Sequence, residues 1–339
     1  MELFKSDEIN NFFNAKGYKC IKPYKITDTP RNNETVFVTA GIQPSIDFYE
    51  KLNTNNKMKT FIAQPVLRTQ YLDSLEEGSS LAFINPTTAG FNINPKDYEL
   101  QIKDWYNLFK QIGLNLDRIS TQRRTTNNLW GNLSLNGISI FYYYDKPGVG
   151  KVEIGDSTYY DRVESIDNES NCIKTLSDSG FGMERLRWCT LDESKSYFDI
   201  YSDTQKINST TKGLISALGM LGVNGVIPSQ KNSGYRARLF SKRLVKETNG
   251  KSLNIEEQKY LVECLKYWAD WEKISLTEEK AQRIFLIIKK EFNRNCNSFL
   301  LNQLNPEQKK LVRKINVNLP RQEFIKRLAS AKIYIEEER

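Results

Sequence analysis

The stretch that most constrains this chain is residues 177–189, SDSGFGMERLRWC. Gly180 and Gly182 alternate along a predicted strand, and a helical pattern follows at once. Glycine at alternate positions leaves one face of a strand without side chains, so that another group can approach the backbone. Arg185 adds a guanidinium at the edge of this surface, a group that binds phosphates and stacks on flat bases. The stretch therefore indicates a nucleotide-holding turn, and an ordinary strand-to-helix turn with an incidental ion pair is the alternative.

The chain contains no histidine among its 339 residues. This excludes a histidine-based catalytic triad, a histidine general base and any histidine metal site. The five cysteines are scattered without CxxC spacing, which indicates reduced thiols and neither disulfides nor a zinc site; we predict no protein-held metal. Chemistry must then depend on carboxylates, Lys, Arg or Tyr and on alignment, as reactions of phosphates and activated acyl groups can.

Charge divides the chain into two parts. Residues 1–205 carry 23 basic and 27 acidic side chains, a net charge of −4, whereas residues 206–339 carry 26 and 14, a net charge of +12. The division predicts an active domain followed by a domain that binds a polyanion, although a lysine-rich proteome is an alternative cause. No run approaches the roughly 18 apolar residues of a membrane helix, and the N-terminus lacks a signal-peptide pattern. We therefore expect a cytoplasmic protein with no membrane partner.

Hydrophobic periodicity predicts strands and helices in the first part and helices alone in the second. In the first part we expect helices at 6–17, 43–52 and 96–113, strands at 18–21, 61–68, 80–84, 138–144, 151–154 and 157–160, a β-rich run at 35–39, and a loop from Arg123 to Trp130. In the second part we expect helices at 234–248, 255–272, 277–293, 306–315 and 320–337.

Six stretches in residues 1–250 combine glycine, aromatic and charged residues in a fixed order. They read FFNAKGYK, FVTAGIQPSIDFY, PVLRTQYLDSLEEG, NNLWGNL, SDSGFGMERL and VNGVIPSQKNSGYRARLFSKRLV. In this order the chain resembles the N-terminal half of alanyl-tRNA synthetases, a family of class II aminoacyl-tRNA synthetases. The resemblance implies an α+β fold, a class II antiparallel sheet flanked by helices in a catalytic domain (1–205), followed by an all-α, tRNA-recognition-like domain (206–339).

The resemblance also implies a site for ATP with Mg²⁺. Arg68 stands where class II motif 2 supplies an arginine to the α-phosphate of ATP. Arg185 stands where motif 3 supplies one near the γ-phosphate and adenine, and Gly180 and Gly182 become the floor on which ATP lies. Arg68 and Arg185 are thus the predicted catalytic residues.

The amino-acid site that the resemblance implies differs from the family pattern. Asp178 falls on the aspartate that holds the substrate α-ammonium, and Trp130 falls on the pocket tryptophan. The family's WN-x-VF-x-Q strand is replaced by a segment with Gly155 for Trp, Asp156 for Asn and Thr158 for Val. We expect Gly155 to enlarge the space and the two polar residues to admit a polar or larger amino acid than alanine, whereas drift in a degenerate paralogue is the alternative.

In the basic part, the resemblance implies contacts with a tRNA acceptor stem. Asn232 is expected to read the acceptor-stem base pair, and Arg236, Arg238, Lys242 and Arg243 are expected to hold phosphates nearby.

Three functions remain open from the sequence. The first is a short tRNA ligase without an editing domain, because attack of a substrate carboxylate on a phosphorus requires neither a protein nucleophile nor a histidine base. The second is an amino-acid-activating paralogue that supplies a biosynthetic pathway or a carrier. The third is a non-catalytic tRNA-binding paralogue, favoured by the absence of the family's glutamates from 81–91 and 133–141. The amino acid and the oligomeric state are not specified.

Overall fold

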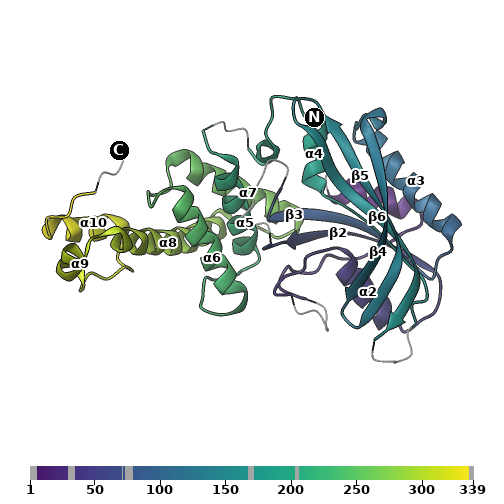
Figure 1. Ribbon diagram of the computed structural model, residues 1–339, viewed down its shortest axis with the longest axis horizontal. Helices are drawn as coiled ribbons and strands as arrows, with labels where there is room; N and C mark the ends of the chain where they lie inside the picture. Colours follow the sequence, from purple (N-terminus) through teal and green to yellow (C-terminus); the bar gives the residue numbers. More distant parts are fainter. Residues whose placement is uncertain are drawn as a thin grey trace. The chain divides into compact units, whose positions relative to one another are not determined.

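A seven-stranded sheet is the centre of the first of two units in this chain (Figure 1). The computed structural model describes residues 6–29, 35–70, 72, 79–166, 172–202 and 206–335. The first unit comprises residues 1–70 and 77–200, and the second contains residues 201–339.

The sheet is antiparallel except for one pair. Its order is β1-β2-β3-β7-β6-β5-β4, and only β1 and β2 run parallel among these neighbours. The strands are β1 (Lys19–Cys20), β2 (Met58–Leu67), β3 (Ala82–Phe91), β4 (Ile119–Trp130), β5 (Leu133–Lys146), β6 (Gly150–Ser165) and β7 (Leu176–Phe181). The helices of this unit are α1 (Ser6–Ala15), α2 (Ile42–Lys51), α3 (Pro95–Gln111) and α4 (Met183–Thr190), with short 3₁₀ turns η1 (Leu116–Arg118) and η2 (Tyr197–Ile200).

Helix α3 packs on one face of the sheet through a buried polar network. Its start is fixed by Pro95 and by a capping box between Asn94 and Asp97. Gln101 donates from Nε2 to the Thr88 hydroxyl at 2.7 Å and accepts from the Ser177 hydroxyl at 2.6 Å. Because buried polar groups are costly unless paired, these bonds fix the register of α3 on β3 and β7.

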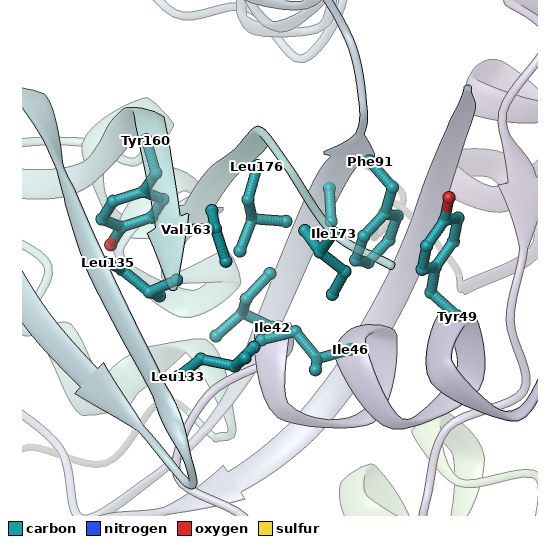
Figure 2. Packing of buried hydrophobic residues seen from close by; sticks show 11 residues of the cluster. Ile42, Ile46, Tyr49, Phe91, Leu133, Leu135, Tyr160, Val163, Ile173 and Leu176 are labelled. Carbon is teal, nitrogen blue, oxygen red and sulfur yellow. The ribbon is translucent and has the colours of Figure 1, made fainter. Parts of the chain in front are cut away.

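Helix α2 packs on the opposite face (Figure 1). Figure 2 shows Ile42, Ile46 and Tyr49 of α2 among side chains of β3, β5, β6 and β7. The Tyr49 ring stacks on Phe91 with ring centres 4.2 Å apart. Burial of this apolar cluster holds α2 over one end of the face.

The second unit is built from helices. They are α5 (Ser209–Val223), α6 (Asn232–Glu247), α7 (Ile255–Trp271), α8 (Glu278–Gln303), α9 (Pro306–Val312) and α10 (Arg321–Ser330). Helix α5 is buried along nearly its whole circumference, and α6, α7 and α8 each contact it. A separate small core around Phe324 and Leu328 joins the end of α8 to α9 and α10. Within the described residues, no helix combines the length and apolarity needed to cross a membrane.

The predicted α+β class with an antiparallel sheet flanked by helices is confirmed, whereas two local predictions were wrong and one helix was not predicted. Residues 123–130 belong to strand β4 and do not form a loop. Residues 35–39 form no strand; Val38 makes two isolated backbone bonds, to Ile26 and Leu67, so the β-forming residues of this run reflect burial instead. Helix α5 was not predicted because apolar residues on every side leave no amphipathic stripe.

Candidate functional site

The site face is the face of the sheet that carries Asp156, Thr158, Asp178 and Gly180, on the same side as α2. In the β6–β7 ladder Asp156 pairs with Gly180, and Thr158 pairs with Asp178. Residues paired across a ladder, and residues two apart along a strand, project to the same side of a sheet. The two aspartates are therefore diagonal neighbours, and both remain partly exposed. The structure brings these predicted residues together.

Arg68 reaches the site face from the end of β2. Its Nε donates to the carbonyl of Thr39 at 2.9 Å, in the segment that leads into α2. Its guanidinium lies 5.0 Å from the centre of the Phe83 ring, a cation–π distance. The positive charge is close enough to Asp156 and Asp178 to lower the pKa of both carboxyls. Arg68 thus acts on Asp178 from two strands away and on Asp156 from three strands away.

Burial nevertheless dominates the electrostatics of the two carboxyls. Desolvation, and then the charge of Glu153, raise the pKa of Asp156 to about 6, against the opposing effect of Arg68. Desolvation and the charge of Asp156 raise the pKa of Asp178 well above its usual range. The carboxyl of Asp178 has no hydrogen bond to the residues described, and the contact of the Asp156 carboxyl with the Thr158 hydroxyl is long, at 3.5 Å. Such carboxylates gain much from a cationic ligand.

Polar side chains of β4 and β5 border the aspartates. The hydroxyls of Ser139 and Thr158 are 2.7 Å apart. Burial, and then the charges of Asp178 and Asp156, raise the pKa of Tyr160 in β6. The Tyr160 hydroxyl accepts a hydrogen bond from Asn128 at 2.9 Å. The site face therefore offers neutral hydroxyls beside its two carboxylates.

The surroundings of the glycines near the site differ from one glycine to the next. A Cβ on Gly180 would lie 3.2 Å from Nδ2 of Asn85, so this glycine accommodates β3 side chains. A Cβ on Gly182 would meet only Arg185 side-chain carbons, at an ordinary 3.6 Å. A Cβ on Gly155 would lie 2.4 Å from the Gly180 carbonyl oxygen and 2.8 Å from the Phe181 Cα. The expectation that Gly155 enlarges the amino-acid space was therefore wrong, because this glycine permits close pairing of β6 with β7.

Arg185 lies in the first turn of α4. Its Nη1 donates to the carbonyl of Glu153 in β6 at 2.9 Å. Its neighbour Glu184 is fully buried and accepts two hydrogen bonds from the amide of Ile84, at 3.0 and 3.1 Å. Glu184 therefore anchors α4 to β3. The sequence did not reveal this role, because an acidic residue is common in the first turn of any helix.

Two further residues that sequence reasoning missed connect α2 to the site face. Asn85 accepts from the Gly41 amide at 2.9 Å and donates to the Phe181 carbonyl at 2.8 Å. Gln43 accepts from the Thr39 amide at 2.8 Å, while its Nε2 is buried without a partner among the described residues. A polar residue at a buried strand or helix position was the available signal for both.

Trp130 lies at the end of β4. It packs against the apolar cluster of Figure 2, which includes Ala89 and Tyr160. Ala89 is the β3 partner of Asp178. The indole N–H of Trp130 is buried and has no partner within the described part of the chain. The tryptophan thus borders the site face on the side of α2.

The acidic groups do not by themselves make a metal site. Among the described residues, no three or more His, Cys, Asp or Glu side chains are grouped so as to hold an ion. Mg²⁺ is commonly held by one or two carboxylates together with substrate phosphates. Two aspartates are therefore too few to hold such an ion alone, and a divalent ion here would need further oxygens from a bound ligand.

In the second unit, the five predicted tRNA contacts lie on α6 but differ in exposure. Asn232 and Lys242 are exposed, and Arg236 is half-buried. Arg238 pairs with Glu291 of α8 at 3.3 Å, and Arg243 pairs with Glu247 at 3.1 Å. Helical spacing places Asn232, Arg236 and Arg243 along one side of the helix, whereas Lys242 lies one turn after Arg238, the residue that pairs with α8.

The start of α6 has an unusual backbone. Asn232 has a φ of +50°, a left-handed conformation that asparagine tolerates better than most residues. This gives a backbone reason for asparagine at this position. Gln230, two residues earlier, is also exposed, and so is Tyr235, with 48% of its surface accessible.

Comparisons with known proteins find likeness in fold only. No family model and no curated protein matches the chain. The chain is similar to the solved structure of apo histidyl-tRNA synthetase from S. aureus, with 10% identity, a TM-score of 0.39, and coverage of 56% of this chain and 70% of that chain. It is also similar to a pyrrolysyl-tRNA synthetase from Desulfitobacterium hafniense, with 11% identity, a TM-score of 0.38, and coverage of 53% and 65%. At these values neither structure assigns a substrate or a residue role to this chain.

Proposed function

We propose that this chain activates an amino acid with ATP and transfers the aminoacyl group to the acceptor end of a tRNA, as an alanyl-tRNA synthetase-like ligase. The observation that carries the proposal is the meeting of Arg68, Asp156 and Asp178 on one face of the sheet. An α-amino acid presents an ammonium and a carboxylate on one carbon. A carboxylate without a hydrogen bond, opposed by a guanidinium, is complementary to that pair of charges.

Activation requires charge stabilisation and alignment. The substrate carboxylate attacks the α-phosphorus of ATP, and pyrophosphate leaves. Asp178 holds the ammonium, and Arg68 stabilises the negative charge that develops on the α-phosphoryl oxygens. Arg185 holds the distal phosphates or the adenine, and bound Mg²⁺ supplies further neutralisation of phosphate charge. No step requires a histidine, in agreement with the composition.

The proposed partner of the second unit is the acceptor stem of tRNA. Its residues from 206 onward carry a net charge of +12. On α6 we assign phosphate contacts to Arg236, Lys242 and Arg243, and base contacts to Asn232 or its exposed neighbour Gln230. Arg238 is engaged with Glu291 and is assigned mainly to the packing of α6 on α8.

The test of activation is amino-acid-dependent exchange of pyrophosphate into ATP, measured with each common amino acid. We expect exchange with at least one, and its loss in Arg68→Ala. Asp161→Asn is a matched control, because Asp161 is an exposed aspartate in the same strand. Absence of exchange with every amino acid tested contradicts activation and favours the third function, a non-catalytic tRNA-binding paralogue.

The acceptor is tested separately. Gel-shift with total tRNA over a series of salt concentrations should show binding that weakens as salt rises, because phosphate contacts release counterions. Exchange without tRNA binding favours the amino-acid-activating paralogue that serves another acceptor, which the altered β6 residues Asp156 and Thr158 also suit.

A further inference from the structure

The site face holds one carboxylate more than an ordinary α-amino acid can neutralise. We propose that the amino acid selected here carries a second amino group on a short side chain, and that Asp156 is the residue that selects it. The proposal rests on the proposed function of the same site, and it names the substrate class.

The position of Asp156 fits a ligand group next to the α-ammonium. Asp156 and Asp178 lie on neighbouring strands, two pairs apart along the β6–β7 ladder and on the same face. Side chains at such diagonal positions are separated by about 7 Å at the strand and can converge on one ligand. A substrate with two or three methylene groups between its α-carbon and its second nitrogen spans two such carboxylates.

The charges on this face also favour a ligand with a second cationic group besides its α-ammonium. Arg68 is the cation that acts on both aspartates, and a substrate carboxylate or phosphate competes for it. Once the α-ammonium has neutralised Asp178, Asp156 retains only the long 3.5 Å contact with Thr158. Glu153 adds negative charge beside it. A carboxylate partly removed from water and left without a counter-charge is unfavourable, so a cationic ligand group is stabilised there.

A separate observation indicates that the Arg68 end of the site suits a ligand oxygen that accepts hydrogen bonds. Gln43 is 4% exposed, and its Nε2 has no hydrogen-bond partner among the described residues. Its Oε1 is bound by the amide of Thr39, the residue whose carbonyl receives the Arg68 Nε–H. A buried unpaired donor on a residue that shares Thr39 as a partner with Arg68 suits a carboxylate or phosphate oxygen. The anionic part of the substrate thus belongs near Arg68, and its amino groups belong near the two aspartates.

The experiment compares short diamino acids with neutral amino acids of similar size. Pyrophosphate exchange is measured with L-2,4-diaminobutyrate and L-ornithine and, as neutral controls, with L-homoserine and L-norvaline. We expect kcat/KM to be about 10- to 100-fold higher for a diamino acid, the range associated with one hydrogen bond to a charged group. Asp156→Asn should remove this preference, and Asp161→Asn should keep it.

Calorimetric titration of the same amino acids without ATP separates this inference from the proposed activity. Binding of a diamino acid to the unaltered protein and not to Asp156→Asn supports the inference even where exchange is absent. Exchange or binding that prefers the neutral amino acids, or a preference unchanged by Asp156→Asn, overturns the inference and leaves activation standing. Titration with Mg²⁺ alone gives a third outcome: tight binding lost in Asp156→Asn would make Asp156 a metal ligand and would also overturn the inference.

Discussion

The site face of the first unit and the exposed side of α6 in the second both carry charged side chains, but they organise them differently. On the site face, two aspartates and one arginine are fixed by strand register, and burial shifts the pKa of both carboxyls. On α6, the cations are spread along the surface of the helix, where Arg236 is half-buried and Lys242 is exposed.

The difference teaches where a single substitution should matter. A charge in a partly desolvated cluster interacts strongly with its neighbours, whereas exposed charges are screened by water and salt. The first region should lose its function through one residue, and the second should lose affinity in small increments.

The largest effect is expected for Arg68→Ala. Removal of a preorganised donor from a developing negative charge costs about 100- to 1,000-fold in kcat. Arg68→Lys should retain part of the activity, because it keeps the charge but not the fork-shaped donor set. Pyrophosphate exchange measures both variants, and thermal unfolding checks that loss of the Thr39 and Phe83 contacts has not unfolded the protein. Full activity in Arg68→Ala would place the chemistry elsewhere.

The next effect concerns stability at the β6–β7 pairing. Gly155→Ala places a Cβ against backbone atoms of Gly180 and Phe181, and we expect a loss of about 1–3 kcal/mol in the free energy of unfolding. Gly182→Ala meets only side-chain carbons at 3.6 Å and should change the free energy of unfolding by less than about 0.5 kcal/mol. Denaturant unfolding compares the two. A lower ATP affinity in Gly182→Ala with unchanged stability would support nucleotide contact at this glycine.

A smaller effect is a pH dependence of amino-acid affinity. The carboxylate form of Asp156 binds an ammonium, so affinity should fall as pH falls through about 6, by up to about tenfold per pH unit. The groups that act on Asp156 are Glu153, Arg68, Thr158 and Asp178. In Asp156→Asn the negative charge that raises the pKa of Asp178 is gone, so the decline should begin at lower pH.

The same raised pKa affects folding stability in a defined direction. The ionised form of Asp156 is disfavoured in the folded protein, so its stabilising contribution is present below its unfolded pKa, about 3.9, and is lost as pH rises through about 6. A free energy of unfolding that falls over this range in the unaltered protein, and falls less in Asp156→Asn, agrees with the account. Identical profiles would contradict it.

The smallest effects are expected on α6. Arg236→Ala and Lys242→Ala should each weaken tRNA binding only a few-fold and reduce the salt slope by about one. Arg238→Ala is the contrasting variant, because its pairing with Glu291 predicts a stability loss of about 1 kcal/mol and little change in salt slope. A large, salt-independent loss of tRNA affinity in Arg236→Ala would contradict the contrast, because α6 would then depend on a single residue as the site face does.

The sequence predicted those parts of the fold in which periodicity and burial agree. Strand β2 and helix α3 lie within a few residues of their predicted positions. Strand β4 was missed because it is a polar, mostly exposed edge strand without alternation. Helix α5 was missed for the opposite reason, since it is buried on every side.

The sequence named candidate site residues but not their contacts. The β6–β7 register places Asp156 and Asp178 on one face, and the roles given to them and to Arg68 stay predictions. The role of Gly155 was misjudged because strands were predicted at 151–154 and 157–160 only, whereas β6 runs through Gly155 and alternation places this residue on the face opposite Asp156 and Thr158. The contribution of Gln43 depends on a hydrogen bond to Thr39, which its sequence position alone does not reveal.

The central claim is that the site face binds an activated amino acid through Arg68 and the two aspartates. The most direct measurement is calorimetric binding of stable aminoacyl-sulfamoyl-adenosine analogues, alanyl and 2,4-diaminobutyryl, to the unaltered protein, to Arg68→Ala and to Asp178→Asn. We predict tight binding of at least one analogue and a loss of about 100-fold or more in either variant. Equal binding by all three proteins, or no binding of either analogue, would contradict the claim.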